Sequence, residues 1–145
     1  MTVYPPVPSQ PACRKHLLLV DDEPAFTLLL KAGLERTGHY RIESCNEPEK
    51  ALHLASQMLP DAILLDIMMP GRDGGDIFRE MRQNPLLQGI PTIMLTSLVC
   101  THEVSWQGYV RSGEMLLMSK MSSISKIHEC LLHMIDGHGS RCYAA

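Results

Sequence analysis

Short runs of apolar residues alternate along the chain with segments in which apolar residues recur every three or four positions. Continuous apolar runs bounded by acidic or turn residues are typical of strands buried on both faces of a sheet. They predict strands at residues 16–20, 62–67, 90–97 and 114–119, and YRIESC at residues 40–45 is interpreted as a further strand, which makes five. The helical spacing between and after them predicts five helices, at residues 24–37, 47–58, 75–83, 101–112 and 123–136.

A strand followed by a helix, repeated along a chain, is typical of a parallel sheet with right-handed crossovers. The expected fold class is therefore α/β, a doubly wound five-stranded parallel sheet with helices on both faces, arranged as a three-layer α/β/α sandwich. In such folds ligands bind beyond the carboxyl ends of the strands, near the point where the strand order reverses. The residues that end each strand are thus the first candidates for function.

Composition narrows the class of protein. With 45% hydrophobic and 20% charged residues in 145 positions, the chain is typical of one globular domain. The net charge is -3 and the basic residues are scattered, so we expect no nucleic acid to bind this domain. No apolar run approaches the roughly 18 residues that cross a membrane, and no signal peptide is evident. We expect a cytoplasmic protein that does not contact the membrane.

The two ends of the chain differ from the expected domain at residues 14–137. Residues 1–13 contain four prolines, which favour an extended, unpaired segment, and they are interpreted as a flexible leader. Residues 138–145 are interpreted as a C-terminal tail. The five cysteines include no CxxC pair, which argues against a disulfide framework and against a zinc site.

Polar residues stand at four of the predicted strand ends. They are Asp21 and Asp22 after the first strand, Asp66 in the third, Thr96 in the fourth and Lys120 after the fifth. If these strands are near neighbours, three carboxylates converge with a hydroxyl and an ammonium group. Clustered carboxylates repel one another unless a cation neutralises them. Mg²⁺ prefers oxygen ligands, and no histidine or cysteine stands at these positions, so Mg²⁺ is expected rather than Zn²⁺.

Phosphoryl transfer would use every group in this set. A carboxylate can attack a phosphoryl group and form an aspartyl phosphate, while a metal ion, a lysine and a hydroxyl share the charge on the phosphoryl oxygens. Asp66, Mg²⁺, Lys120 and Thr96 fit those roles. Each residue alone has a structural explanation, such as a helix N-cap for Asp22. The four strand ends together favour the chemical interpretation.

Residues from about 15 to 136 resemble the receiver domain of two-component response regulators, in particular the single-domain chemotaxis-type receivers. The resemblance is carried by four segments: HLLLVDDEP, DAILLDIMMPGRDG, IPTIMLTS and GEMLLMSK. It implies a flavodoxin-like fold with strand order 2-1-3-4-5. It also implies a phosphoprotein of signal transduction and phosphorelay, which is not an enzyme beyond catalysing its own phosphorylation and dephosphorylation.

The resemblance further implies the roles of individual residues. Asp66 would accept a phosphoryl group from a phosphohistidine on a sensor histidine kinase or a histidine phosphotransfer protein. Asp22, Asp66 and the backbone carbonyl of Met68 would hold Mg²⁺, with Asp21 supporting the site indirectly or through water. Thr96 and Lys120 would contact the phosphoryl group and bias a surface that binds a downstream protein target.

Several residues depart from the family pattern. Met121 stands where the family usually has a proline with a cis bond, so we expect a trans bond or a strained loop there. Three positions before the lysine the family normally has Tyr or Phe, coupled to the threonine that corresponds to Thr96. Leu117 stands there in this chain. The segment between Thr96 and Lys120 is longer than usual and contains Gly108, so its helix is expected to be irregular. In the family, the residues two positions after the phosphoacceptor and two after the switch threonine line the route of the hydrolytic water. Here they are Met68 and Leu98, which are apolar and cannot orient a water molecule, so we expect slow self-dephosphorylation.

Two alternatives remain open from the sequence. The departures are compatible with a partly degenerate receiver that docks a partner independently of phosphorylation. A phosphatase of the haloacid-dehalogenase type also uses an aspartyl nucleophile and Mg²⁺, but it needs an acidic residue two positions after the nucleophile. Met68 occupies that position, which argues against the phosphatase.

Overall fold

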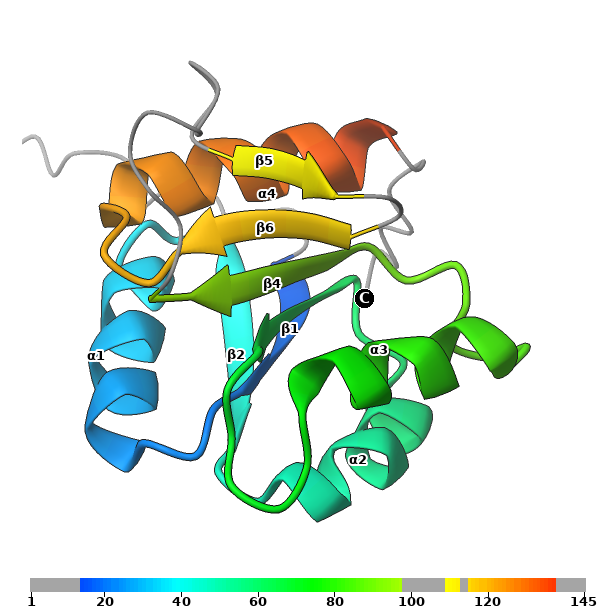
Figure 1. Cartoon of the computed structure of the whole chain (residues 1–145). Coiled ribbons are helices and arrows are strands. Elements are labelled where there is room, and N and C mark those ends of the chain that lie inside the picture. Colours follow the sequence, from blue (N-terminus) through cyan, green and yellow to red (C-terminus); the bar gives the residue numbers. More distant parts are fainter. Residues whose placement is uncertain (1–13, 98–108, 113–114, 138–145) are drawn as a thin grey trace, which may run out of the picture.

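The computed structural model describes residues 14–97, 109–112 and 115–137 (Figure 1). The strands in these ranges are β1 (Lys15–Val20), β2 (Tyr40–Cys45), β3 (Ala62–Asp66), β4 (Thr92–Thr96), β5 (Tyr109–Ser112) and β6 (Met115–Ser119). The α-helices are α1 (Pro24–Glu35), α2 (Ala51–Met58), α3 (Gly74–Gln83) and α4 (Ile124–Gly137), and a short 3-10 helix (Pro48–Lys50) precedes α2. The predicted leader and C-terminal tail lie outside the described residues.

The strands form one sheet in the order β2-β1-β3-β4-β6-β5. Every neighbouring pair from β2 to β6 is parallel, while β5 pairs with β6 in the antiparallel sense. The five parallel strands correspond to the five predicted from the sequence, in the order 2-1-3-4-5. The prediction of a doubly wound, flavodoxin-like α/β fold is therefore confirmed.

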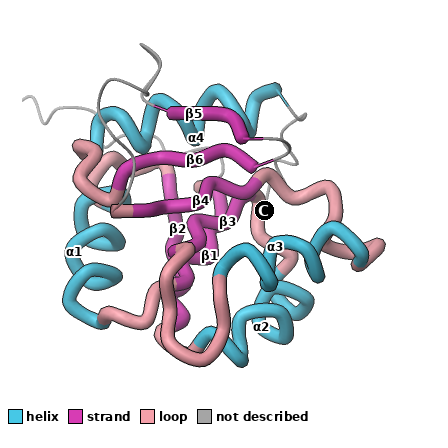
Figure 2. Tube along the Cα trace, in the orientation of Figure 1, coloured by secondary structure: helices cyan, strands magenta, loops and turns pink. Residues whose placement is uncertain are grey.

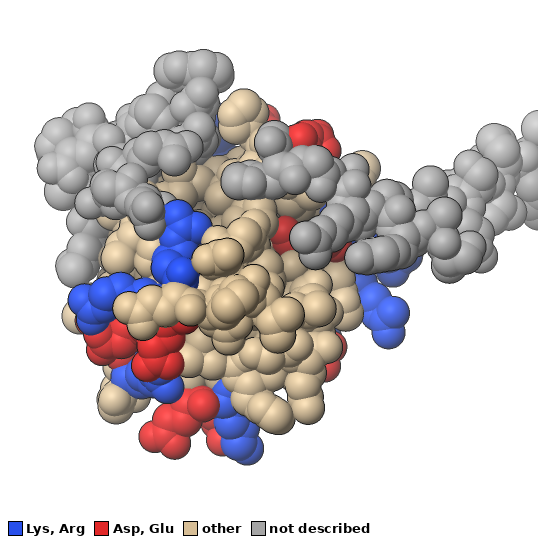
Figure 3. Space-filling view, turned by 90° about the vertical axis from the view of Figure 1, so that its right-hand side faces the viewer, with Lys and Arg blue, Asp and Glu red and all other residues tan. Residues whose placement is uncertain are grey.

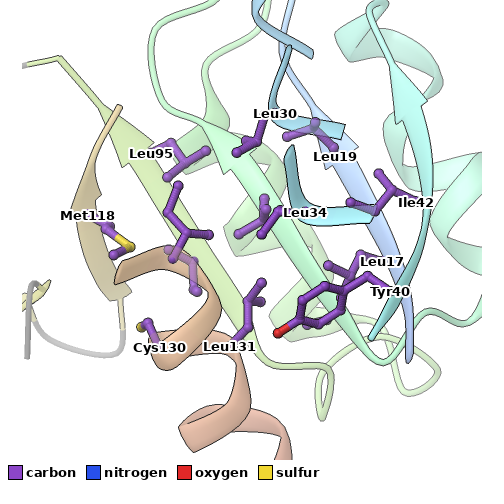
Figure 4. Close-up of a cluster of buried hydrophobic side chains, with 14 of the residues drawn as sticks. Leu17, Leu19, Leu30, Leu34, Tyr40, Ile42, Leu95, Met118, Cys130 and Leu131 are labelled. Carbon is purple, nitrogen blue, oxygen red and sulfur yellow. The ribbon is translucent and has the colours of Figure 1, made fainter. Parts of the chain in front are cut away.

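The sheet has a helical layer on each face (Figures 1 and 2). Successive side chains of its strands alternate between the two faces. Leu17 and Leu19 of β1 belong to a core with α1 and α4, whereas Leu18 and Val20 belong to a core with α2 and α3. This alternation explains why β1 is apolar without interruption, since a strand covered on both faces has no polar side. Figure 4 shows the first core, in which Tyr40 of β2 lies beside Leu17 and Leu131.

The prediction of a helix over residues 101–112 is wrong for its last four residues, which form β5. Residues 101–108 lie outside the described part of the chain. Tyr109 and Val110 are residue types that favour strands, and β5 and β6 are only two residues apart in the sequence, the separation of a β-hairpin. The pairing with β6 therefore outweighs a helical periodicity that was already weak. The described residues accordingly contain four α-helices rather than five.

On the face shown in Figure 3, basic and acidic side chains lie next to one another rather than in separate patches, and α3 carries the surface ion pair Arg79–Asp76. Within the described ranges, the structure holds no helix with the length and apolar character needed to cross a membrane.

Candidate functional site at the carboxyl ends of the strands

The carboxyl ends of β1, β3, β4 and β6 meet at one edge of the sheet. The parallel register aligns Asp66 with Leu95 of β4, and Thr96 with Ser119 of β6. Asp21 and Lys120 directly follow β1 and β6. The strand ends that the sequence analysis singled out thus come together because four parallel strands end at the same level.

Three carboxylates form the centre of the site. Asp21 and Asp66 are buried, with 0% and 3% of their surface exposed, and Asp22 is half-buried. One carboxylate oxygen of each residue lies within 4.8 Å of the corresponding oxygens of the other two. Three negative charges at this spacing repel one another strongly in a buried position.

Lys120 is the cation that faces these acids. Its Nζ atom lies 2.8 Å from Asp21 Oδ2 and 3.5 Å from Asp66 Oδ2, and its side chain is only 14% exposed. The same Nζ atom lies 3.8 Å from Oε1 of the exposed Glu23. Lys120 therefore bridges the two buried carboxylates and compensates part of their charge.

The two oxygens of Asp21 differ in their partners. Oδ1 accepts a hydrogen bond from the backbone N–H of Glu23 at 2.9 Å. Oδ2 is buried and receives no hydrogen bond of acceptable geometry from the described residues, so its contact with Lys120 is an ion pair only. A buried carboxylate oxygen without hydrogen bonds retains capacity to interact with another cation.

Burial, and next the charge of Asp21, raise the pKa of Asp66 from 3.8 to about 6, although Lys120 and a hydrogen bond from the Met68 backbone act in the opposite direction. For Lys120, burial lowers the pKa, but contact with Asp21 and the charges of Asp21, Asp66 and Glu23 outweigh burial and raise it above its usual value. Lys120 is therefore cationic at neutral pH, and Asp66 pays an electrostatic penalty for being ionised.

The donor set fits a hard divalent cation. Every ligand atom in the cluster is a carboxylate oxygen, two of the three residues are buried, and Asp21 Oδ2 lacks hydrogen bonds. Mg²⁺ accepts such oxygen ligands from one or two carboxylates and keeps waters for the rest of its coordination. A divalent ion would also offset the charge of Asp21, which after burial is the next cause of the raised Asp66 pKa.

Thr96 lies at the end of β4 and is buried. Its backbone carbonyl accepts a hydrogen bond from the Lys120 N–H at 2.9 Å, which ties the two strand ends together. The role of the Thr96 hydroxyl toward a phosphoryl group stays a prediction.

The structure shows the surroundings of the residues that the sequence analysis compared with the family pattern. The peptide bond between Lys120 and Met121 is trans, as the replacement of proline predicts. The N–H that a proline would lack donates to Ser119 Oγ at 3.0 Å. Leu117 is half-buried and packs against the core on the α2 and α3 side. Met68 is 61% exposed, and Leu98 lies outside the described residues.

Sequence reasoning missed Asn46, which links the ends of β1 and β2 to helix α1 beside the site. Its Nδ2 donates to the Asp21 carbonyl at 2.8 Å and to Thr27 Oγ1 at 3.0 Å. Asn46 directly follows β2, so applying the strand-end rule to that strand as well would have found it.

Gly74 was also missed as a contributor to the site. A Cβ atom on this residue would lie 2.1 Å from the carbonyl oxygen of Asp66 and 2.9 Å from the Cα of Ile67. Its N–H donates to the Ile67 carbonyl at 2.9 Å. The start of α3 therefore packs directly on the backbone of the residue at the centre of the site, which only glycine permits.

Comparison with known proteins gives one family. The profile of the response regulator receiver domain matches residues 17–131. The response regulator PleD of Caulobacter vibrioides is 39% identical over 83 residues, 57% of this chain and 18% of PleD. The alkaline phosphatase synthesis transcriptional regulatory protein PhoP of Bacillus subtilis is 40% identical over 83 residues, 57% of this chain and 33% of PhoP. The chain thus spans a third or less of the length of these relatives.

Solved structures agree with this assignment. The signal receiver domain of a signal transduction histidine kinase from Syntrophus aciditrophicus superimposes with a TM-score of 0.71 at 26% identity, covering 90% of this chain and 96% of that one. The receiver domain of the sensor histidine kinase PA1611 from Pseudomonas aeruginosa, solved with a magnesium ion in its active site cleft, gives 0.69 at 26% identity, covering 85% and 98%.

Proposed function

The chain belongs to the response regulator receiver domain family, and from this premise we propose that it is a phosphorylation-controlled signalling receiver whose phosphoacceptor is Asp66. The observation that carries the proposal is the convergence of the Asp21, Asp22 and Asp66 carboxylates with Lys120. Burial, and next the charge of Asp21, raise the pKa of Asp66, and such a shifted carboxylate beside two further acids is typical of a functional site.

In the proposed reaction, a carboxylate oxygen of Asp66 attacks the phosphorus atom of a phosphohistidine. An O–P bond forms as the N–P bond breaks, and the departing imidazole takes the bonding electron pair and is protonated by solvent. The donor would be a sensor histidine kinase or a histidine phosphotransfer protein. Because Asp66 must be ionised to attack, its partners have to keep it anionic despite its burial.

We propose that Asp22, Asp66 and the Met68 carbonyl hold Mg²⁺, with Asp21 supporting the site. The bound ion would supply charge neutralisation for the incoming phosphoryl oxygens. The magnesium ion in the PA1611 receiver domain, a similar structure, supports this choice. The carboxylates of this chain would hold the ion beside Asp66.

After transfer, Lys120 is expected to pair with a phosphoryl oxygen and Thr96 to donate its hydroxyl to another. Both residues lie at the ends of β4 and β6, so the new contacts bias that side of the molecule and the surface that a downstream protein target binds. We expect slow self-dephosphorylation, because the exposed Met68 side chain cannot orient a hydrolytic water. The protein would act in the cytoplasm and catalyse no reaction besides its own phosphorylation and dephosphorylation.

The test is phosphorylation by a small phosphodonor such as acetyl phosphate in the presence of Mg²⁺. Intact-mass spectrometry should show one added phosphoryl group on the wild type, none on Asp66→Asn, and none on the wild type after chelation of divalent ions. Asp136→Asn is the matched control, because Asp136 is an exposed acid on α4, outside the cluster. An unmodified wild type with normal circular dichroism would contradict the proposal.

A second candidate function is docking of a partner independently of phosphorylation. The observation that favours it is β5, which occupies the edge of the sheet where the sequence predicted part of a helix. A binding experiment with the downstream partner separates the two functions. Equal affinity for Asp66→Asn and for the phosphorylated wild type would favour docking, whereas a change in affinity on phosphorylation would favour the switch.

A further inference from the structure

The ammonium group of Lys120 has an aromatic neighbour as well as its acidic ones. Its Nζ atom lies 4.4 Å from the centroid of the Phe26 ring. An ammonium over an aromatic face within about 6 Å is attracted by the negative face of the ring, and the attraction grows when water is excluded. Since the Lys120 side chain is only 14% exposed, this contact is largely shielded from water.

Phe26 is held in place by the first turn of α1. Pro24 begins that helix, and Thr27 donates its hydroxyl to the Pro24 carbonyl at 3.0 Å. Asn46 in turn donates to Thr27 Oγ1, which links this turn to the ends of β1 and β2. The Phe26 ring itself packs against the core on the α1 and α4 side. The ring therefore offers the ammonium a fixed platform.

The acidic partners and the ring hold Lys120 in different ways. Asp21, Asp66 and Glu23 surround the ammonium at 2.8, 3.5 and 3.8 Å and compete for it. A carboxylate takes up a hydrogen-bond donor of the ammonium, whereas the ring attracts the ammonium through its face without acting as a conventional acceptor. A lysine resting on a ring can turn from one anion to another while it keeps the ring contact.

We propose that Phe26 is a positioning residue for Lys120, whose ring keeps the ammonium beside Asp66 while leaving it free to turn from Asp21 to a phosphoryl oxygen. The inference rests on the proposed function and deepens it, since it adds a residue that acts on the reaction through Lys120. In the phosphorylated protein the ammonium would leave Asp21 Oδ2 without leaving the ring.

Phosphorylation kinetics with acetyl phosphate and Mg²⁺ test the proposal in a double-mutant cycle of Phe26→Leu and Lys120→Gln. Phe26→Leu keeps an apolar side chain in the core and should slow phosphorylation about three- to tenfold. In the Lys120→Gln background the same change should have no further effect, because the ammonium it positions is absent. Phe26→Tyr keeps the ring face and should restore the rate to within about twofold of wild type. Leu28→Ala, at an exposed position of the same helix, is the control.

The proposal would be overturned if Phe26→Leu lowered the rate by the same factor in both backgrounds, or if Phe26→Tyr lowered it as much as Phe26→Leu does. Either result would assign Phe26 to packing alone. A second measurement needs no phosphorylation. In NMR spectra the Hε protons of Lys120 should show an upfield ring-current shift that Phe26→Leu abolishes and Phe26→Tyr retains. If the wild type accepts no phosphoryl group, the proposed function fails, and the shift alone then decides whether the ring holds the ammonium; its absence would overturn that contact.

Discussion

Asp66 combines two requirements that oppose each other at the scale of a single residue. Asp66 is buried, and in the proposed reaction it has to be ionised so that it can attack the phosphorus atom. Burial and the neighbouring Asp21 raise its pKa to about 6, and Lys120 offsets part of that shift. The ionised form of Asp66 is therefore electrostatically unfavourable, and a bound cation would relieve that cost.

This opposition predicts a pH dependence of stability in the absence of divalent ions. Because the folded pKa of Asp66 lies near 6 and the ordinary value is 3.8, the folded state binds the proton more tightly than the unfolded state. The stabilisation from this group is complete below about pH 4 and is lost as pH rises through about 6, at a cost on the order of 2 kcal/mol. Urea denaturation with a chelator present, at pH 4 to 7, should show this loss in the wild type.

The matched variant is Asp66→Asn, which has no proton to lose at this position. Its free energy of unfolding should exceed that of the wild type at pH 7, and the difference should shrink as pH falls toward 4. A difference that does not change with pH would contradict the assigned environment of Asp66.

Gly74 lies so close to the backbone of Asp66 that a larger residue should disturb the site. Because a Cβ atom would lie 2.1 Å from the Asp66 carbonyl oxygen, which belongs to the backbone, Gly74→Ala must displace either α3 or the end of β3. We expect a loss of roughly 2 kcal/mol or more in the free energy of unfolding and a large loss of phosphorylation rate. Gly89→Ala is the control, since nothing lies within 4 Å of its Cβ position, and it should change neither quantity. An unaffected Gly74→Ala variant would show that the start of α3 does not constrain Asp66.

At the scale of elements, α4 is attached to the sheet by a hydrogen bond as well as by apolar packing. Tyr40, fully buried at the start of β2, places its hydroxyl 2.7 Å from His128 Nδ1 on α4. Burial holds the pKa of Tyr40 well above its usual value, so its phenol stays a neutral donor. Burial, and then the charge of His39, lower the pKa of His128, which keeps its ring neutral and able to accept.

Removing this hydrogen bond should loosen α4. Tyr40→Phe keeps the ring and deletes only the hydroxyl, and we expect it to cost about 1 kcal/mol in chemical denaturation at pH 7.5. Because the folded pKa of His128 is lowered, the stability it contributes is present above about pH 6.5 and decreases as pH falls below that value. His133→Ala, at an exposed position of α4, is the control and should be near neutral. A Tyr40→Phe variant as stable as the wild type would contradict the role assigned to the hydroxyl.

The elements also show what sequence can and cannot predict. The strands β1, β3, β4 and β6 were predictable because a strand covered on both faces is almost wholly apolar, whereas β2 shows a partial alternation of apolar and polar residues. Asp66 and Lys120 were predictable because parallel strands end at one edge. β5 was not, since its stability comes from pairing with β6 rather than from its own periodicity. The contacts of Phe26 with Lys120 and of Gly74 with Asp66 join separate elements, so no local pattern reports them.

At the scale of the whole molecule, the proposed Mg²⁺ site would make the stability of the folded state depend on the concentration of the cation. A ligand that binds only the folded protein stabilises it by about 2.7 kcal/mol at a hundred times its dissociation constant. Mg²⁺ should therefore raise the thermal unfolding midpoint by several degrees, and a chelator should reverse the rise. Asp22→Asn should reduce the effect, whereas Glu43→Gln, an exposed acid on β2, should retain it. An identical Mg²⁺ effect in Asp22→Asn and wild type would place the ion elsewhere.

The measurement that tests the central claim most directly locates the phosphoryl group itself. Borohydride reduces an aspartyl phosphate to homoserine, so protein treated with acetyl phosphate and Mg²⁺ can be reduced, digested and sequenced by tandem mass spectrometry. We predict homoserine at position 66, only when both phosphodonor and Mg²⁺ were present. Homoserine at another aspartate, or unmodified Asp66 under the full conditions, would contradict the assignment of Asp66 as the phosphoacceptor.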